Sequence, residues 1–184
     1  MIDRGVFDAM YETADDPWGF TTSAYETRKR AITLASLPQQ RYRSAFEPGC
    51  SIGLLTEELA QRCDHVLACD VSDRALQLAR HRVGDASVRL ERREIPRDWP
   101  EETFDLILLS EVAYFLDHGE LDELVERAGR SLAPGGDLVA VHWLGPIDGY
   151  PLDGPTAHTR LAAGPWQRLV RHLEHEFLLE VYRA

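Results

Sequence analysis

The stretch Phe46-Glu47-Pro48-Gly49-Cys50-Ser51-Ile52-Gly53 joins an apolar strand to an amphipathic helix. Its small residues let the backbone approach a ligand closely, and glycine tolerates the positive φ that a sharp turn needs. In a doubly wound sheet, ligands bind at the carboxyl ends of the strands, next to such turns. The stretch therefore predicts an α/β fold with a small-molecule site at the end of its first strand.

Two acidic residues lie where they can bind a cationic nucleoside. Glu47 ends the first strand, and its carboxylate can attract an ammonium group there. Asp70 ends the next apolar run, roughly twenty residues after the turn, where a carboxylate accepts hydrogen bonds from the hydroxyls of a ribose. Ser72 is better placed than Asp70 to cap the following helix, which favours the ribose role. We expect Val71 to line the same site.

A dinucleotide site is the main alternative for this turn. It uses the pattern G-x-G-x-x-G, whereas Gly49 and Gly53 enclose three other residues and leave no evident seat for a pyrophosphate. S-adenosylmethionine carries no phosphate, so an acidic strand end without an anion nest suits it. A nicotinamide-dependent oxidoreductase, and a protein that binds S-adenosylmethionine without catalysis, stay open as alternatives.

The rest of the chain alternates apolar runs with segments of helical period, which is typical of a mostly parallel sheet with helices on both faces. We expect strands at about 44–47, 65–70, 87–92, 104–110 and 137–143. Three helices are expected between them, one through Leu55, Leu59 and Cys63, one through Ala75, Ala79 and Val83 behind a Ser72 cap, and one through Leu121, Leu124, Val125, Ala128 and Leu132 that stops at Pro134-Gly135-Gly136.

The C-terminal part completes the expected sheet. Residues 177–182 form an apolar run that we expect to be a last, antiparallel strand, preceded by a helix or a strand near 166–173. Residues 145–155 are rich in glycine and proline, which predicts a loop and a candidate substrate lid. The sheet would have six or seven strands, and residues 1–184 would form a single domain with an N-terminal helical cap (1–40), a cofactor-binding core (44–143) and a substrate-side loop and strand (144–184).

Composition limits the possible partners. The 184 residues carry a formal net charge of −11, which repels a nucleic-acid backbone and suits a small neutral or cationic acceptor. The three cysteines lack the paired spacing of a zinc site, so we expect neither a metal nor disulfides. No segment approaches the ~18 apolar residues of a membrane span, and we expect a cytoplasmic protein, monomeric or homodimeric, that binds no membrane.

The strand, the glycine turn and Asp70 together resemble the class I S-adenosylmethionine-dependent methyltransferases, whose sheet is Rossmann-like. Ser51 stands where the class pattern E/D-x-G-x-G-x-G has its middle glycine. Residues 104–110 resemble the fourth strand of the class, and Leu132-Ala133-Pro134-Gly135-Gly136-Asp137-Leu138 resembles the entry to its fifth. Residues 16–29 and 110–116 resemble a narrower branch, the nodulation protein S type, which methylates the amino group of an amino sugar.

The resemblance implies roles at the cofactor site. Glu94 and Ile95 follow the third strand, where the class recognises adenine, although Glu94 also reads as a surface charge. Ser110 lies where the backbone of the class touches the methionine portion. An N-terminal helix would lie across the cofactor, with Trp18 and Tyr25 shielding it. Arg28 would pair with the methionine carboxylate, unless it lies on a solvated helix face.

The acceptor side is expected at the ends of the fourth and fifth strands. Glu111 and His142 are candidate bases, and Glu111 could also hold an ammonium group; the alternatives are a helix cap and a hydrogen-bonded rim histidine. Tyr114, Trp143 and Tyr150 are candidate stacking surfaces, or pack under a loop. We expect methyl transfer to a small-molecule acceptor, an amine such as an amino sugar, with O-methylation of a small metabolite as the alternative.

Overall fold

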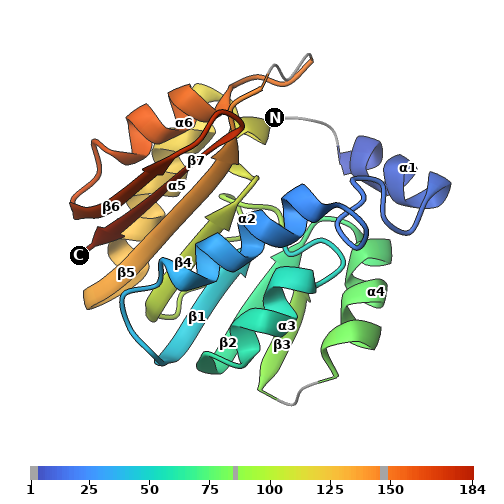
Figure 1. Cartoon of the computed structure of the whole chain (residues 1–184), viewed down its shortest axis with the longest axis horizontal. Helices are drawn as coiled ribbons and strands as arrows, with labels where there is room; N and C mark the ends of the chain where they lie inside the picture. Colours follow the sequence, from blue (N-terminus) through green and yellow to red (C-terminus); the bar gives the residue numbers. More distant parts are fainter. Residues whose placement is uncertain (1–3, 85–86, 146–148) are drawn as a thin grey trace.

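The computed structural model describes residues 4–84, 87–145 and 149–184. A seven-stranded sheet of order β3-β2-β1-β4-β5-β7-β6 runs through this part of the chain (Figure 1). The strands are β1 (Tyr42–Pro48), β2 (Cys63–Asp70), β3 (Val88–Arg92), β4 (Phe104–Ser110), β5 (Leu132–Trp143), β6 (Gln167–Leu173) and β7 (Phe177–Arg183). The helices are α1 (Arg4–Thr13), α2 (Ala24–Ala35), α3 (Leu54–Ala60), α4 (Asp73–Val83), the 3-10 helix η1 (Ala113–Phe115), α5 (His118–Ser131) and α6 (Gly154–Leu161).

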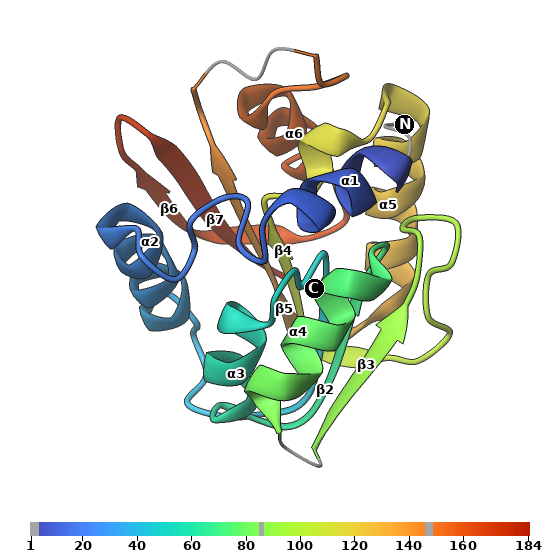
Figure 2. The same ribbon diagram turned by 90° about the vertical axis from the view of Figure 1, so that its right-hand side faces the viewer.

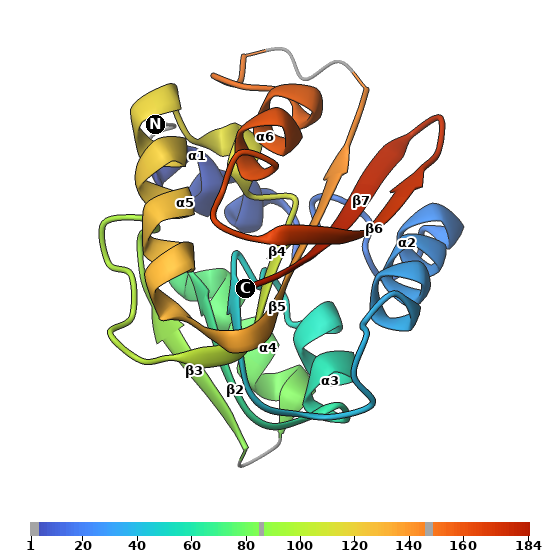
Figure 3. The same cartoon turned by 90° about the vertical axis from the view of Figure 1, so that its left-hand side faces the viewer.

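Helices cover both faces of the sheet, which explains why its central strands are apolar on both sides. Apolar side chains of α5 and α6 pack on one face, and those of α2, α3 and α4 pack on the other. Figure 3 shows α5 and α2 on opposite sides of the sheet. Strands β1 to β5 are parallel, whereas β7 is antiparallel to both β5 and β6. The predicted Rossmann-like sheet with an antiparallel C-terminal strand is confirmed.

The parallel pairing brings the carboxyl ends of the central strands to one edge of the sheet. Because β1 lies between β2 and β4, the chain crosses over in opposite directions on the two sides of the β1–β4 pair, which is where such sheets bind ligands. Helix α1 lies over this edge (Figure 2). It is held there by Phe7, whose ring meets Phe115 edge-on at 5.0 Å, and by Tyr11, whose hydroxyl lies 2.5 Å from that of Ser51.

Most predicted elements lie where the sequence places them. Ser72 caps α4 by accepting a hydrogen bond from the backbone N–H of Ala75. The apolar face predicted for the third helix, which begins with Leu121, is buried on α5. Leu132, the last residue predicted for that face, belongs to β5 instead. Residues 166–173, for which a helix and a strand were both open, form β6.

Two predicted boundaries are wrong. Cys63 does not continue the helix before it, because α3 ends at Ala60 and Cys63 pairs with Tyr42 at the start of the β1–β2 ladder. Residues 145–155 are not a loop throughout, since α6 begins at Gly154 behind the capping side chain of Asp153. Pro155 opens this helix rather than breaking it, because the first turn has no partner for the missing N–H. Residues 146–148 of the predicted lid lie outside the described residues.

Candidate functional site

A cavity of about 520 Å³ lies at the carboxyl ends of β1, β2, β4 and β5, beneath α1 and α2. Most residues predicted for the site line it. These are Trp18, Tyr25, Glu47, Gly49, Cys50, Ser51, Asp70, Val71, Glu94, Ile95, Ser110, Glu111, Tyr114 and Trp143. Four predicted residues do not line it, and each has a different physical reason. These are Arg28, Gly53, His142 and Tyr150.

The glycine turn after β1 forms the floor of the cavity. Gly49 has a φ of +72°, and a Cβ atom there would lie 2.2 Å from a methyl group of Val112. Gly53 caps α3 with a φ of +80°, and a Cβ atom there would lie 3.0 Å from that of Ala79. Gly53 therefore supports the turn by letting α3 and α4 approach each other, and it does not line the cavity.

Asp70 presents its carboxylate to the cavity from the end of β2. One oxygen accepts the backbone N–H of Ser51 at 2.9 Å, and the other accepts that of Ser72 at 3.0 Å. Each oxygen keeps a lone pair for a further donor, which is the arrangement that two neighbouring ribose hydroxyls need. Burial raises the pKa of Asp70, while the backbone N–H groups of Ser72, Ser51 and Val71 act in the opposite direction.

Glu47 is buried in the cavity wall at the end of β1. Its Oε2 atom has no hydrogen-bond partner among the described residues. Burial raises the pKa of Glu47 from 4.5 to about 8, against the opposing effect of the nearby Thr56 hydroxyl, and the charge of Asp70 adds to the rise. A buried carboxyl with an unpartnered oxygen fits a cationic ligand, because an adjacent ammonium group would supply both a donor and a countercharge. The wall therefore fits the ammonium end of S-adenosylmethionine.

The segment after β3 forms another part of the wall. Glu94 is buried, its backbone N–H donates to the carboxylate of Asp98, and Arg97 lies 3.2 Å from its Oε2 atom. Glu94 is therefore not the solvated surface charge that was the alternative reading. Ile95 beside it adds an apolar surface, so the pair can face a ring with a polar edge such as adenine.

The N-terminal cap contributes aromatic side chains and cations, but not the predicted arginine. The guanidinium of Arg28 points away from the cavity and forms two hydrogen bonds with Glu174, at 2.6 and 2.7 Å. Arg30 lines the cavity instead, where it donates to the backbone carbonyl of Phe20 at 3.1 Å and its Nε atom lies 3.4 Å from Oε1 of Glu58. The prediction that Arg28 binds a carboxylate in the cavity is therefore corrected, and Arg30 is the arginine of α2 that can do so.

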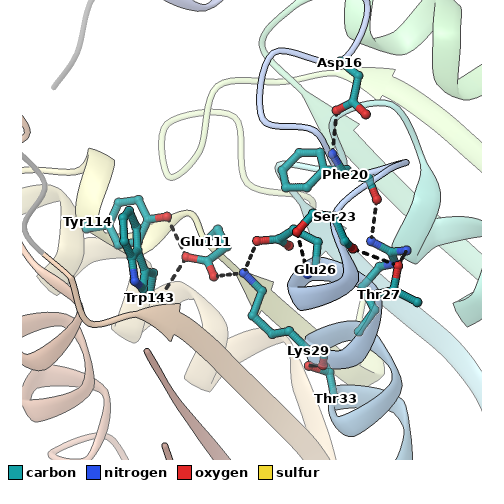
Figure 4. Close-up of polar contacts among 11 residues, drawn as sticks. Asp16, Phe20, Ser23, Glu26, Thr27, Lys29, Thr33, Glu111, Tyr114 and Trp143 are labelled. Atoms are coloured by element: carbon teal, nitrogen blue, oxygen red, sulfur yellow. Dashed lines mark hydrogen bonds and ion pairs between the residues drawn. The ribbon is translucent and has the colours of Figure 1, made fainter. Parts of the chain in front are cut away.

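Glu111 has three donors around its carboxylate at the end of β4 (Figure 4). Lys29 donates to Oε1 at 2.5 Å, while the hydroxyl of Tyr114 and the backbone N–H of Trp143 donate to Oε2 at 2.6 and 3.0 Å. The ammonium of Lys29 also donates to Glu26 at 2.9 Å, and only 4% of the Lys29 side chain is exposed. Lys29 therefore joins the N-terminal cap to the sheet.

His142 is not available as a base. It is fully buried, its Nε2 atom accepts the backbone N–H of Ala113, and its Nδ1 atom contacts Nε2 of His158 at 3.2 Å. His158 in turn pairs with Glu180 at 2.8 Å. Burial, followed by the nearby imidazole of His158, lowers the pKa of His142 well below its usual value. Its role is structural, since it holds η1 beside the cavity.

Tyr150 is not part of the cavity wall. Its ring packs edge-on against Phe115 at 4.9 Å and lies 6.3 Å from that of Tyr114. The aromatic packing that was the alternative for Tyr150 is what the structure has. Trp143 differs, because it lines the cavity and 41% of it is exposed.

Sequence reasoning missed several lining residues on the cap. Phe7 and Tyr11 come from α1, which carries no recognisable motif. The position of Lys29 could have been predicted, because Tyr25, Lys29 and Thr33 are spaced four residues apart and therefore lie on one face of α2. A lysine in the middle of such a face is a candidate for a buried ion pair.

Comparisons with known proteins bear on this site. Residues 9–140 match the family described as nodulation protein S (NodS). The chain belongs to this family. Nodulation protein S of Rhizobium tropici is 37% identical over 129 residues, which are 68% of this chain and 54% of that protein. The chain thus spans about half the length of this relative.

Solved structures agree with the family. The crystal structure of the N-methyltransferase NodS from Bradyrhizobium japonicum WM9 in complex with S-adenosyl-L-homocysteine has a TM-score of 0.87 and 25% identity, covering 99% of this chain and 98% of that one. The crystal structure of a putative methyltransferase from Pseudomonas syringae has a TM-score of 0.78 and 42% identity, covering 88% and 100%. The resemblance to NodS is thereby confirmed. In the described residues, no helix combines the length and apolar character needed to cross a membrane.

Substituting Asp70 tests the ribose site. We expect Asp70→Asn to weaken binding of S-adenosylhomocysteine by about 10- to 100-fold, because a hydrogen bond to a charged group contributes ~1.5–3 kcal/mol. Isothermal titration calorimetry measures the affinity, and thermal melting checks that the turn stays folded. Unchanged affinity in a folded variant would exclude Asp70 from the site.

The raised pKa of Glu47 predicts proton release on cofactor binding. At pH 7 the carboxyl is largely protonated in the free protein, since its pKa is about 8, and an adjacent ammonium group favours the anion. Binding of S-adenosylmethionine at pH 7 should therefore release close to one proton, measured by calorimetry in buffers of different ionisation enthalpy. Glu47→Gln should release none.

The raised pKa of Glu47 also predicts how the stability of the folded protein depends on pH. The unfolded chain ionises Glu47 near pH 4.5 and the folded protein near pH 8, so the ligand-free protein loses stability as the pH rises through this window. Glu47→Gln should flatten this part of the pH profile, as measured by urea unfolding. Identical profiles for the two proteins would contradict the assignment.

Proposed function

We propose that this chain is an S-adenosylmethionine-dependent methyltransferase that acts on a small-molecule amine. The proposal is carried by the buried Glu47 carboxyl with its unpartnered oxygen, which lies in the same cavity as Asp70. It is supported by family membership and by the structural likeness to a NodS enzyme that holds S-adenosylhomocysteine.

Each part of the cofactor has a proposed set of residues. Asp70 holds the ribose and Glu47 the ammonium group, whereas Arg30 is the proposed partner of the carboxylate. Residues 4–40 act as a cap that excludes water, and the aromatic rings of the cap stack over the opening, where the ring of Trp18 lies 5.7 Å from that of Phe20. Gly49, Cys50, Ser51, Val71, Glu94, Ile95, Ser110 and Tyr25 complete the proposed cofactor wall.

The acceptor is proposed to be an amine because neither base that the sequence favours, His142 or Glu111, is free to deprotonate a hydroxyl. His142 is buried with both ring nitrogens engaged, and three donors surround the carboxylate of Glu111. When bound, S-adenosylmethionine supplies an activated methyl group, and the lone pair of a neutral amine forms the N–C bond as the S–C bond breaks and its electrons return to sulfur. The protein then contributes mainly proximity and alignment.

The acceptor is proposed to bind in the space that has the ends of β4 and β5 on one side and the β6–β7 turn on the other. This turn belongs to the predicted substrate-side part of the chain, residues 144–184. Tyr114 and Trp143 form its aromatic surfaces, and Glu176 lies at its exposed rim. Glu111 acts here as a positioning residue, because it holds Lys29, Tyr114 and the backbone of Trp143 together.

A methyl-transfer assay tests the proposal. We expect turnover with primary amines and none with matched alcohols, measured as formation of S-adenosylhomocysteine. Glu111→Gln should lower kcat by at least about tenfold while the affinity for S-adenosylhomocysteine stays within about twofold, because the side chain of Glu111 contacts none of the residues proposed to bind the cofactor.

Two results would contradict this assignment. Turnover of alcohols in preference to amines would favour O-methylation. Tight binding of S-adenosylmethionine with no turnover over a broad amine panel would favour a protein that binds the molecule without catalysis.

A further inference from the structure

Glu26 presents a carboxylate to the cavity that the proposed reaction does not yet use. It lies on α2, one turn before Lys29, and its Oε1 atom accepts the Lys29 ammonium at 2.9 Å. No donor among the described residues hydrogen-bonds to its Oε2 atom. The side chain is 15% exposed and lines the cavity, so this oxygen is open to a ligand.

Glu111 is the carboxylate that the sequence favours for binding an ammonium group, but unlike Glu26 it has no oxygen without a hydrogen-bond donor among the described residues. Its two oxygens already accept hydrogen bonds from Lys29, Tyr114 and the backbone of Trp143. An incoming ammonium group would have to displace one of these donors. Figure 4 shows Glu26 and Glu111 on opposite sides of the Lys29 ammonium, so a ligand beside Glu26 keeps the Glu111 contacts intact.

Glu26, Lys29 and Glu111 form a cluster whose net negative charge can be neutralised by one additional cation. Glu26 and Glu111 share the single ammonium of Lys29, which leaves a net charge of about −1 in a partly buried place where charge is costly unless it is paired. Glu176 also lines the cavity, but it is exposed to water, which screens it. The Lys29 ammonium lies 5.0 Å from the centre of the Tyr25 ring, so the cluster already holds one cation beside an aromatic face.

We propose that Glu26 is the carboxylate that receives the ammonium group of the acceptor and selects cationic over neutral acceptors. Its open Oε2 atom then accepts one ammonium proton, which leaves the neutral amine whose lone pair forms the N–C bond. Lys29 positions Glu26 and occupies the space between the two carboxylates, so that only one further cation is needed. This inference rests on the proposed methyl transfer to an amine and names the residue that binds the amine.

The test uses pairs of probes that differ in charge and little else. Ethanolamine is compared with ethylene glycol, and glucosamine with glucose, each titrated into the protein loaded with S-adenosylhomocysteine. Glu26→Gln keeps the size of the side chain and removes its charge. Glu174→Gln is the matched control, because it removes a nearby carboxylate that pairs with Arg28 and lies outside the cavity wall.

We expect the wild type to prefer the amine of each pair. Glu26→Gln should lower the affinity for the amines by about 10- to 100-fold and should leave the affinity for S-adenosylhomocysteine within about twofold. Glu174→Gln should stay within about twofold on both. In turnover assays, Glu26→Gln should raise the KM for amines by a similar factor.

The inference is overturned if Glu26→Gln, shown by thermal melting to be folded, keeps the amine preference of the wild type. The proposed function fails separately, since in that case the wild type itself would methylate no amine.

Discussion

The ion pair between Lys29 and Glu111 joins the N-terminal cap to the end of the central strand, in the wall of the cavity. The two residues are 82 positions apart in the chain, and the lysine is almost completely buried. Breaking a buried ion pair by removing one partner costs ~3–5 kcal/mol, because the other charge stays buried and uncompensated. The contact therefore couples the position of α2 to the shape of the site. Tyr114 and the backbone of Trp143 complete the same network, so the cap, η1 and β5 meet at a single carboxylate.

Carboxylates divide the cavity into two parts with different chemistry. Glu47 and Asp70 lie on the side of β1 and β2, where burial disfavours their charge until a cationic nucleoside neutralises it. Glu26 and Glu111 lie on the side of α2 and β4, where a lysine already compensates for one of the two charges. The proposed methyl donor, which is positively charged, and the proposed cationic acceptor would thus both meet acidic walls, in agreement with the acidic composition of the chain.

Predictions succeeded where neighbouring residues decide the outcome and were wrong where a distant element does. Arg28 and Arg30 are two positions apart, and a rotation of ~100° per residue on a helix sends their side chains to different surroundings. Arg28 meets Glu174 from the β6–β7 turn, which sequence spacing cannot reveal. His142 ends its strand as predicted, yet α6 brings His158 against it and buries it. The sequence analysis did not predict α6, because the glycine and proline that begin this helix are also typical of loops.

The amino-acid sequence by itself determined the α/β class, the glycine turn and the two acidic strand ends, because hydrophobic period and turn chemistry act over a few residues. It also contained enough motif to indicate the nodulation protein S family. Only the tertiary structure decided which charged side chains face the cavity. That choice depends on pairing between segments that lie far apart in the chain, such as α2 with β4 and α2 with the β6–β7 turn. Side-chain charges pair through space, and local sequence carries no record of which partner the fold will bring within reach.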